Sequence, residues 1–113
     1  MDKVTKYRKI VRELMQYQAD IRSNREGIET QFNVTTDEKH FQLVNVGWRR
    51  KRRVYGCFLH IDVLENGRVY IQHDGTDIVV AQKLIDAGIP KEDIVLAFNE
   101  PSVRHFVEGF ALA

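Results

Sequence analysis

The stretch from Cys57 to Ile71 reads CFLHIDVLENGRVYI, and it decides the fold because it describes two strands joined by one turn. Apolar and polar residues alternate on both sides of Asn66-Gly67, a strong signal for a two-residue hairpin turn of type I′. Such a turn also sets the register of the cross-strand pairs. The expected pairs are Glu65 with Arg68, Ile61 with Gln72 and His60 with His73.

Periodicity on either side of this hairpin predicts the remaining elements. Strands are expected over Ile28–Val34, Phe41–Trp48, Val54–Leu64 and Arg68–His73, and helices over Val4–Ile21, Ile78–Ala87 and onward from Pro101. Asp77 is the expected N-cap of the middle helix and Gly88 its stop, with the short apolar segment Ile94–Phe98 beyond. Short connections favour neighbouring antiparallel strands. The order predicts an α+β fold with an N-terminal helix, a four-stranded antiparallel meander and two C-terminal helices.

The bulk composition is that of an ordinary globular protein. The 113 residues are 43% hydrophobic and 29% charged, with a formal net charge of +1, and we expect one domain spanning residues 1–113. The single cysteine, Cys57, cannot form an internal disulfide, which fits a reducing compartment such as the cytoplasm. We expect Cys57 to be a small buried residue. No signal peptide and no apolar run of membrane-spanning length is recognisable.

Five consecutive cations, Arg49-Arg50-Lys51-Arg52-Arg53, fall on one predicted turn between Trp48 and Tyr55. One interpretation is contact with the phosphates of DNA or RNA, supported by the two aromatic side chains. Two other interpretations stay open: a solvated turn, and a patch that binds an acidic partner protein. The overall charge alone does not favour nucleic acid.

His60, Asp62 and His73 should share one face of the predicted hairpin. Two imidazoles and a carboxylate can bind zinc or another divalent metal with a coordination position left open. A hydrogen-bonded polar cluster is the expected alternative, because most buried polar groups are simply hydrogen-bonded. We therefore expect no catalytic residue, no cofactor and no strongly bound metal, and a small metal-dependent enzyme is the alternative that stays open.

The third predicted strand is apolar on both faces. Leu59, Ile61 and Val63 point one way, while Phe58 and Leu64 point the other. We expect the second face to be covered by a helix or by another subunit, because a large exposed apolar patch is unusual on a monomer. We therefore expect the protein to form a homo-oligomer or a complex with a partner protein. The residues expected at or near that contact are Phe106, Val107, Phe110 and Leu112.

Several segments in this order resemble the XisI-like family, small proteins described as controlling factors for excision of the fdxN DNA element. The segments are Ile28–Gln31, Asn45–Trp48, Arg52–Cys57, His60–Asp62, Ile71–Thr76, Pro90–Leu96 and Phe110–Ala113. The chain departs from the family pattern at Arg49-Arg50-Lys51, and also at Val79 and Lys83, where the family usually has a glycine and a glutamate.

The resemblance implies a role in site-specific DNA rearrangement, beside a recombinase and a second factor, the nuclease-like XisH. It implies no catalytic residues. On this basis we expect a non-enzymatic controlling factor that acts by contact with an XisH-like partner. The alternatives are a nucleic-acid-binding module that uses residues 49–53 and a metal-dependent enzyme at His60, Asp62 and His73.

Overall fold

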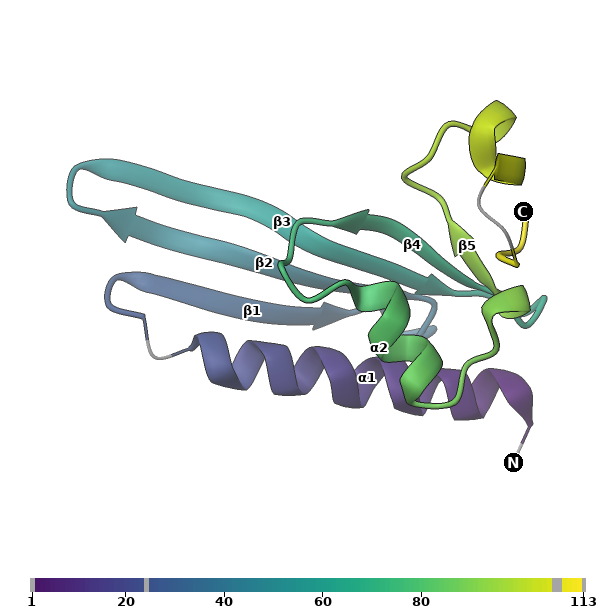
Figure 1. Cartoon of the computed structure of the whole chain (residues 1–113). Coiled ribbons are helices and arrows are strands. Elements are labelled where there is room, and N and C mark those ends of the chain that lie inside the picture. Colours follow the sequence, from purple (N-terminus) through teal and green to yellow (C-terminus); the bar gives the residue numbers. More distant parts are fainter. Residues whose placement is uncertain (1, 24, 107–108, 113) are drawn as a thin grey trace.

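The chain begins with a long helix and continues as a meander of strands (Figure 1). The computed structural model describes residues 2–23, 25–106 and 109–112, with the backbone alone at residues 103, 105 and 106. The elements are α1 (Lys3–Arg22), β1 (Ile28–Val34), β2 (His40–Arg49), β3 (Arg52–Val63), β4 (Val69–Asp74), α2 (Val80–Asp86) and β5 (Ile94–Leu96). Two short 3-10 helices, Lys91–Asp93 and Pro101–Phe106, flank β5.

The five strands form one sheet in the order β1-β2-β3-β4-β5. The first four pair antiparallel, whereas β5 pairs parallel to β4. The prediction of an α+β fold with an N-terminal helix is confirmed, but the prediction of four strands and two C-terminal helices is wrong. The apolar segment after Pro90 becomes a fifth strand because α2 provides the crossover that a parallel neighbour needs. The helix expected from Pro101 is a short 3-10 helix.

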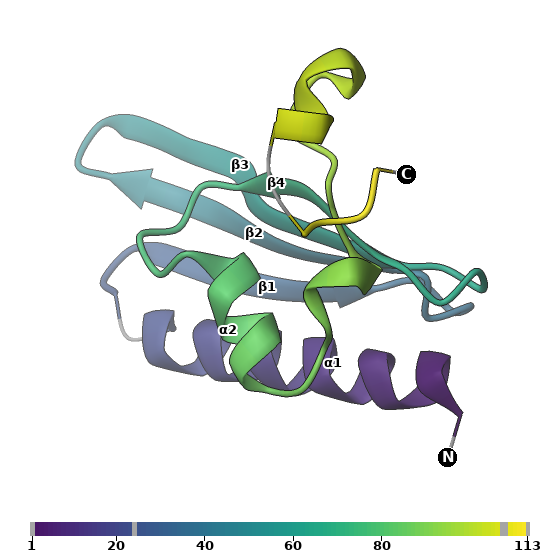
Figure 2. The same cartoon turned by 45° about the vertical axis from the view of Figure 1, so that its right-hand side comes forward.

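The two α-helices cover the same face of the sheet (Figure 2), and the C-terminal segment lies beside β5, where Ala111 forms a bridge with Val95. The stripe of α1 that packs on the sheet consists of Tyr7, Val11, Met15 and Ala19, which recur at the spacing of helical turns. Facing it are alternate residues of the central strands, among them Leu59, Ile61 and Val63 of β3. The core is therefore a single layer between helices and sheet.

The N-terminal half of α1 is also attached to the segment that leads into β5. The buried hydroxyl of Tyr7 donates a short hydrogen bond to the carboxylate of Asp93, and the Lys3 ammonium lies 3.1 Å from the same carboxylate. Burial of Asp93 acts to raise its pKa, but the bonds from Tyr7 and Lys3 outweigh it and hold the pKa below its ordinary value. Residues far apart in sequence are thus joined at one end of the molecule.

The structure confirms the predicted hairpin between β3 and β4, but the turn that joins the two strands differs from the prediction. Only Gly67 has a positive φ there (81°), so the loop contains three residues rather than two. The Leu64 N–H donates to the Arg68 carbonyl at 3.1 Å, and Ile61 therefore pairs with Ile71, not with Gln72. A bulge at Gln72 then restores the expected pairing of His60 with His73.

A second bulge interrupts the ladder between β2 and β3. Leu43 pairs with Leu59 but Val44 pairs with Cys57, so Phe58 is the extra residue. Phe58 packs against the core, and the guanidinium of Arg22 lies 5.2 Å from the centre of its ring. The expectation that β3 is apolar on both faces is therefore wrong, because the bulge turns Phe58 inward.

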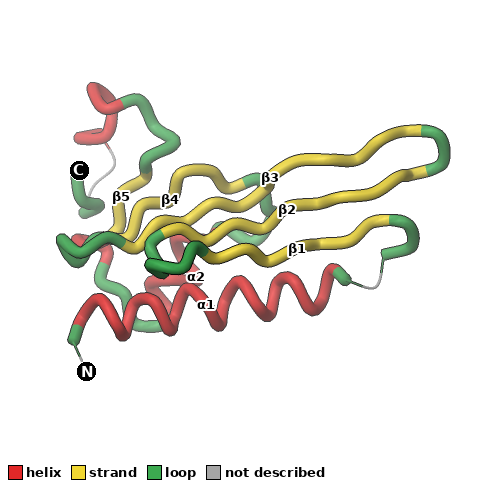
Figure 3. Tube along the Cα trace, turned by 180° about the vertical axis from the view of Figure 1, so that it is seen from behind, coloured by secondary structure: helices red, strands yellow, loops and turns green. Residues whose placement is uncertain are grey.

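β3 is the longest strand, and its neighbour β4 accompanies only part of it. The β3–β4 ladder runs from Val63 to Leu59, whereas β2 pairs with β3 as far as Arg52 (Figure 3). The end of the β2–β3 hairpin also extends past β1, whose first residue, Ile28, pairs with Gly47. The tip of this hairpin consequently stands away from the rest of the sheet.

The start of α2 is held by a residue other than the expected Asp77. The helix begins at Val80, and its N–H donates to Oδ2 of Asp74 at 3.1 Å, while Oδ1 of Asp74 accepts from the Thr76 N–H at 2.9 Å. Asp77 makes only a 3.9 Å ion pair with Arg22 at the surface. The helix ends at Asp86 shortly before Gly88, whose φ of 115° ends it as predicted.

Replacing Asp74 should destabilise the fold much more than replacing Asp77. We expect Asp74→Ala to lower the free energy of unfolding by about 1–2 kcal/mol, because the Val80 N–H at the start of α2 and the Thr76 N–H before it lose their acceptor. Asp77→Ala is the matched control and should change it by less than about 0.5 kcal/mol. Urea denaturation measures both, and equal losses would contradict the assignment of the cap to Asp74.

The bond between Tyr7 and Asp93 should make stability depend on pH. Since folding lowers the pKa of Asp93, its contribution is present above the ordinary carboxylate pKa and is lost as the pH falls through the lowered value. Tyr7→Phe should therefore cost about 1.5–3 kcal/mol at neutral pH and less in acid. Tyr17→Phe, at an exposed position of α1, should cost nothing at either pH. A Tyr7→Phe cost that stays constant into acid would refute this linkage.

Candidate functional site

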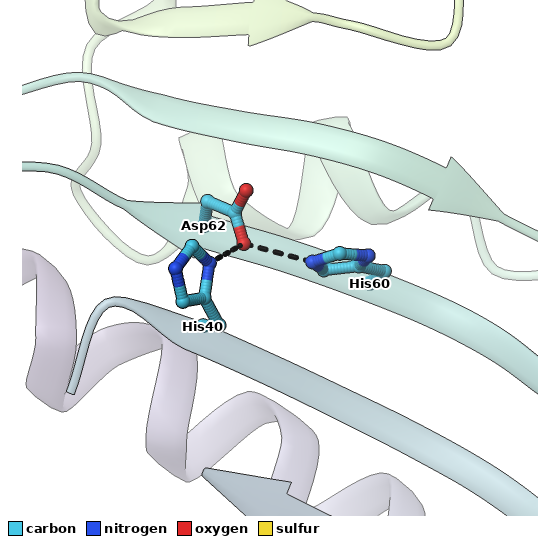
Figure 4. Close-up of side chains that lie close together, drawn as sticks. All are labelled: His40, His60 and Asp62. Atoms are coloured by element: carbon cyan, nitrogen blue, oxygen red, sulfur yellow. Dashed lines mark hydrogen bonds and ion pairs between the residues drawn. The ribbon is translucent and has the colours of Figure 1, made fainter. Parts of the chain in front are cut away.

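A polar cluster lies on the sheet face that the helices leave uncovered, near the start of β2 (Figure 4). His40, the first residue of β2, pairs directly with Asp62 of β3, and His60 lies two residues before Asp62. Residues two apart on a strand, and residues paired across strands, present their side chains on the same face. All three side chains therefore lie together.

Asp62 is the centre of this cluster. Its Oδ1 lies 2.7 Å from Nδ1 of His40 and 2.8 Å from Nε2 of His60, and its Oδ2 accepts a 3.1 Å hydrogen bond from the Gln72 amide. The residue is only 7% exposed. A carboxylate buried to this degree needs several donors to replace the water it has lost, and these three neighbours provide them.

The sequence analysis assigned two of the three members correctly. His60 and Asp62 lie together as expected, and His73 lies opposite His60 as expected. His73 is exposed, however, and is not among the groups that contact Asp62. Its place is taken by His40, which sequence reasoning missed because only the register of β2 against β3 reveals it.

A hollow of about 370 Å³ opens over the two imidazoles. It lies where β1 and β2 are joined, and its lining residues are Asn33, Val34, Thr35, His40, Gln42 and His60. Apart from Val34, every lining side chain can donate or accept a hydrogen bond. A small polar ligand or ordered water can therefore reach both histidines from solvent.

The basic run occupies the tip of the β2–β3 hairpin. Arg49 pairs with Arg52, and Arg50 has the positive φ (59°) that closes the turn. Within the described part of the chain, residues 49–52 make no side-chain hydrogen bond or ion pair, and they line a shallow hollow of about 590 Å³. Five of the 17 cations lie here, so the rest of the chain has a formal net charge of −4, against +1 for the whole. The tip is therefore strongly positive relative to the remaining surface.

Arg53 joins this tip to two exposed aromatic side chains. Its guanidinium lies 5.4 Å from the ring centre of Trp48 and 5.8 Å from that of Tyr55, a geometry of cation–π contact. Trp48 is 54% exposed and Tyr55 72% exposed. We refer to Trp48, Arg53 and Tyr55 together as the aromatic patch.

Cys57 is exposed, so the expectation of a buried residue is wrong. Surrounding protein atoms nevertheless remove enough water to raise the pKa of its thiol, and this outweighs the bond that the thiol donates to the Leu59 carbonyl. A thiol with a raised pKa is mostly protonated at neutral pH and is a poor nucleophile.

The residues expected at an interface fall into three groups. Phe110 is half-buried against the core, with the Lys91 ammonium 5.0 Å from its ring centre. Leu112 is 59% exposed. Val107 and the side chain of Phe106 lie outside the described residues. The backbone near Ala111 forms a bridge with Val95 of β5, which buries Val95 completely.

The sequence profile of the XisI protein family matches residues 1–112. The chain belongs to the XisI family. The resemblance noted from the sequence segments is thereby confirmed. No helix within the described residues combines the length and apolar composition that a membrane crossing requires.

Two solved structures of XisI proteins from Anabaena variabilis ATCC 29413 share the fold. A XisI-like protein is 31% identical, with a TM-score of 0.87 over 96% of this chain and 98% of that one. The fdxN element excision controlling factor XisI is 29% identical, with a TM-score of 0.81 over 99% of this chain and 100% of that one. The search of curated proteins found no match.

Proposed function

We propose that this chain is a controlling factor for the excision of a DNA element and that it acts by contact with another protein. The observation that carries the proposal is the match along nearly the whole length of both chains to a XisI protein named for that role. The two chains are similar over their whole lengths at 29% identity, and this favours a shared mode of action more than similarity over one part of each chain would.

The proposed partner is an XisH-like, nuclease-related protein, and a site-specific recombinase is the enzyme whose reaction the pair controls. Two exposed surfaces of this chain are suited to a protein contact. The aromatic patch contains the three residue types most enriched in binding hot spots, Trp, Arg and Tyr. The exposed side chain of Leu112 is the second, in the C-terminal segment directly after Ala111, which forms a bridge with Val95 of β5.

A non-enzymatic mode of action is part of this proposal. The thiol of Cys57, the only cysteine, has a raised pKa, which does not suit a nucleophile. We further propose that the protein acts in the cytoplasm and self-associates through its C-terminal segment when no partner is present.

Co-expression with the XisH-like protein tests the proposal most directly. A stable complex should form, and Leu112→Ala should weaken it by roughly tenfold to a hundredfold, the effect of losing a buried leucine side chain. Phe110→Ala should weaken it as well, with some loss of stability because Phe110 also packs on the core. Tyr17→Ala, at an exposed site of α1, is the matched control and should leave affinity unchanged.

The mass of the purified protein gives the second readout. Light scattering at high micromolar concentration should detect a dimer or larger species in the absence of partner. A monomer that also fails to bind the XisH-like protein would refute the proposal of action by protein contact.

A second candidate function is nucleic-acid binding by the hairpin tip. The observation that favours it is that four neighbouring cations, residues 49–52, have no protein partner among the described residues. Unpaired cations attract polyanions, and the adjacent aromatic patch can stack on unpaired bases.

Salt dependence distinguishes this candidate from contact with a protein alone. Arg50→Gln combined with Lys51→Gln should weaken binding to single-stranded DNA and reduce the slope of log affinity against log salt by roughly 0.7 for each phosphate that the variant no longer neutralises. Lys6→Gln combined with Lys9→Gln removes the same charge from exposed sites of α1 and should change neither quantity. Equal effects of the two double variants would show that net charge, not the hairpin tip, is responsible.

A further inference from the structure

We propose that His40, His60 and Asp62 form a binding site for one divalent transition-metal ion of the zinc class. The donor atoms are two imidazole nitrogens and one carboxylate oxygen, which lie within 4.8 Å of one another. This is a donor set that zinc, cobalt and nickel accept, with at least one further position left for water or a ligand. The inference does not depend on the function proposed above, because it concerns ion binding only.

The separations between these donor atoms are close to those of a metal site. Ligand atoms about 2.0–2.2 Å from a tetrahedral ion lie roughly 3.3 Å from one another. Each imidazole nitrogen is now 2.7 or 2.8 Å from the Asp62 oxygen, so binding needs an outward movement of about half an ångström. The histidine side chains have room for it, since both are partly exposed and line the hollow above the cluster.

Residues around the three donors fix their orientation by hydrogen bonds, as the residues that surround the ligands of a metal site commonly do. The Gln72 amide donates to Oδ2 of Asp62 and so leaves Oδ1 directed at the two imidazoles. The backbone N–H of His40 donates to the Thr35 hydroxyl at 3.2 Å, which holds the start of β2 in place. Both strands belong to the middle of the sheet, so the ligands are mounted on a rigid support.

The burial of Asp62 supplies the driving force. A carboxylate that is 7% exposed has lost most of its hydration, and the hydrogen bonds from His40, His60 and Gln72 that replace it come from uncharged or partly exposed groups, which stabilise a negative charge less than a cation does. A divalent ion between the three donors places two positive charges beside the carboxylate, and each neutral imidazole then carries its proton on the ring nitrogen that does not face the ion.

Cobalt is the most informative probe, because its visible absorption reports both binding and coordination geometry. Tag-free, metal-stripped full-length protein should bind one equivalent of Co²⁺ with ligand-field bands, and added Zn²⁺ should abolish those bands. His40→Ala and His60→Ala should each lose the saturable signal. Gln72→Ala should keep the site but bind roughly 10–100-fold more weakly, as expected for the loss of a group that orients a ligand.

His73→Ala is the matched control, because His73 lies opposite His60 on the same sheet face but outside the cluster. It should bind Co²⁺ as tightly as the unaltered protein. Thermal unfolding of each metal-free variant establishes that it is folded, and added Zn²⁺ should raise the midpoint only for the proteins that retain the site. Absence of saturable Co²⁺ binding to the unaltered protein, or full binding by His40→Ala, would overturn the proposal and leave a hydrogen-bonded triad.

Discussion

The register of β3 against its two neighbours is the constraint on which the rest of the molecule depends. Side chains alternate between the faces of a strand, so a shift of one residue exchanges the buried and the exposed set. β3 avoids such an exchange through one bulge in each ladder, at Phe58 on the side of β2 and at Gln72 on the side of β4. The bulge at Phe58 aligns His40 with Asp62, and the bulge at Gln72 aligns His60 with His73.

The bulge at Phe58 brings the cluster together. Counting back from the closing pair Arg49–Arg52 without an irregularity places His40 opposite Ile61, a residue of the buried face. With the bulge, His40 meets Asp62 instead, on the uncovered face. Phe58 contributes a second effect, because its ring joins the core under Arg22. The extra residue in β3 therefore explains why the Phe58 ring packs against the core and why His40 lies on the uncovered face.

The parts of this fold that were predicted from sequence are those that follow from local pattern. The stripe of α1, the meander of β1 to β4 and the stop at Gly88 each depend on residues close together in the chain. The same holds for the pair His60 and Asp62, which is a matter of spacing along one strand. A short segment such as Ile94–Leu96 carries too few residues to show a period, and only its place beside β4 makes it a strand.

The predictions that were wrong share one physical cause. Bulges, loop lengths and the choice of a helix cap are not encoded by a distinct local sequence pattern. Asn66-Gly67 is compatible with a two-residue loop and with a three-residue loop, and the structure takes the latter. Asp74 and Asp77 are both plausible caps, and the choice depends on where the chain leaves β4. His40 could be assigned to the cluster only after the bulge was known. The loop, the cap and the position of His40 each depend on packing across the sheet and not on the residues that are adjacent in the sequence.

The long hairpin has one further consequence, which concerns solubility. The Phe58 carbonyl accepts a hydrogen bond from the Gly75 N–H, and beyond Phe58 the backbone of β3 has no neighbouring strand on its β4 side within the described residues. An open edge of this kind invites pairing with the same edge of another copy, the first step of sheet aggregation. Arg52 and Arg53 lie on this edge, and charged side chains on an exposed edge strand oppose such pairing. These two cations of the hairpin tip therefore reduce the tendency of the protein to aggregate through its open sheet edge.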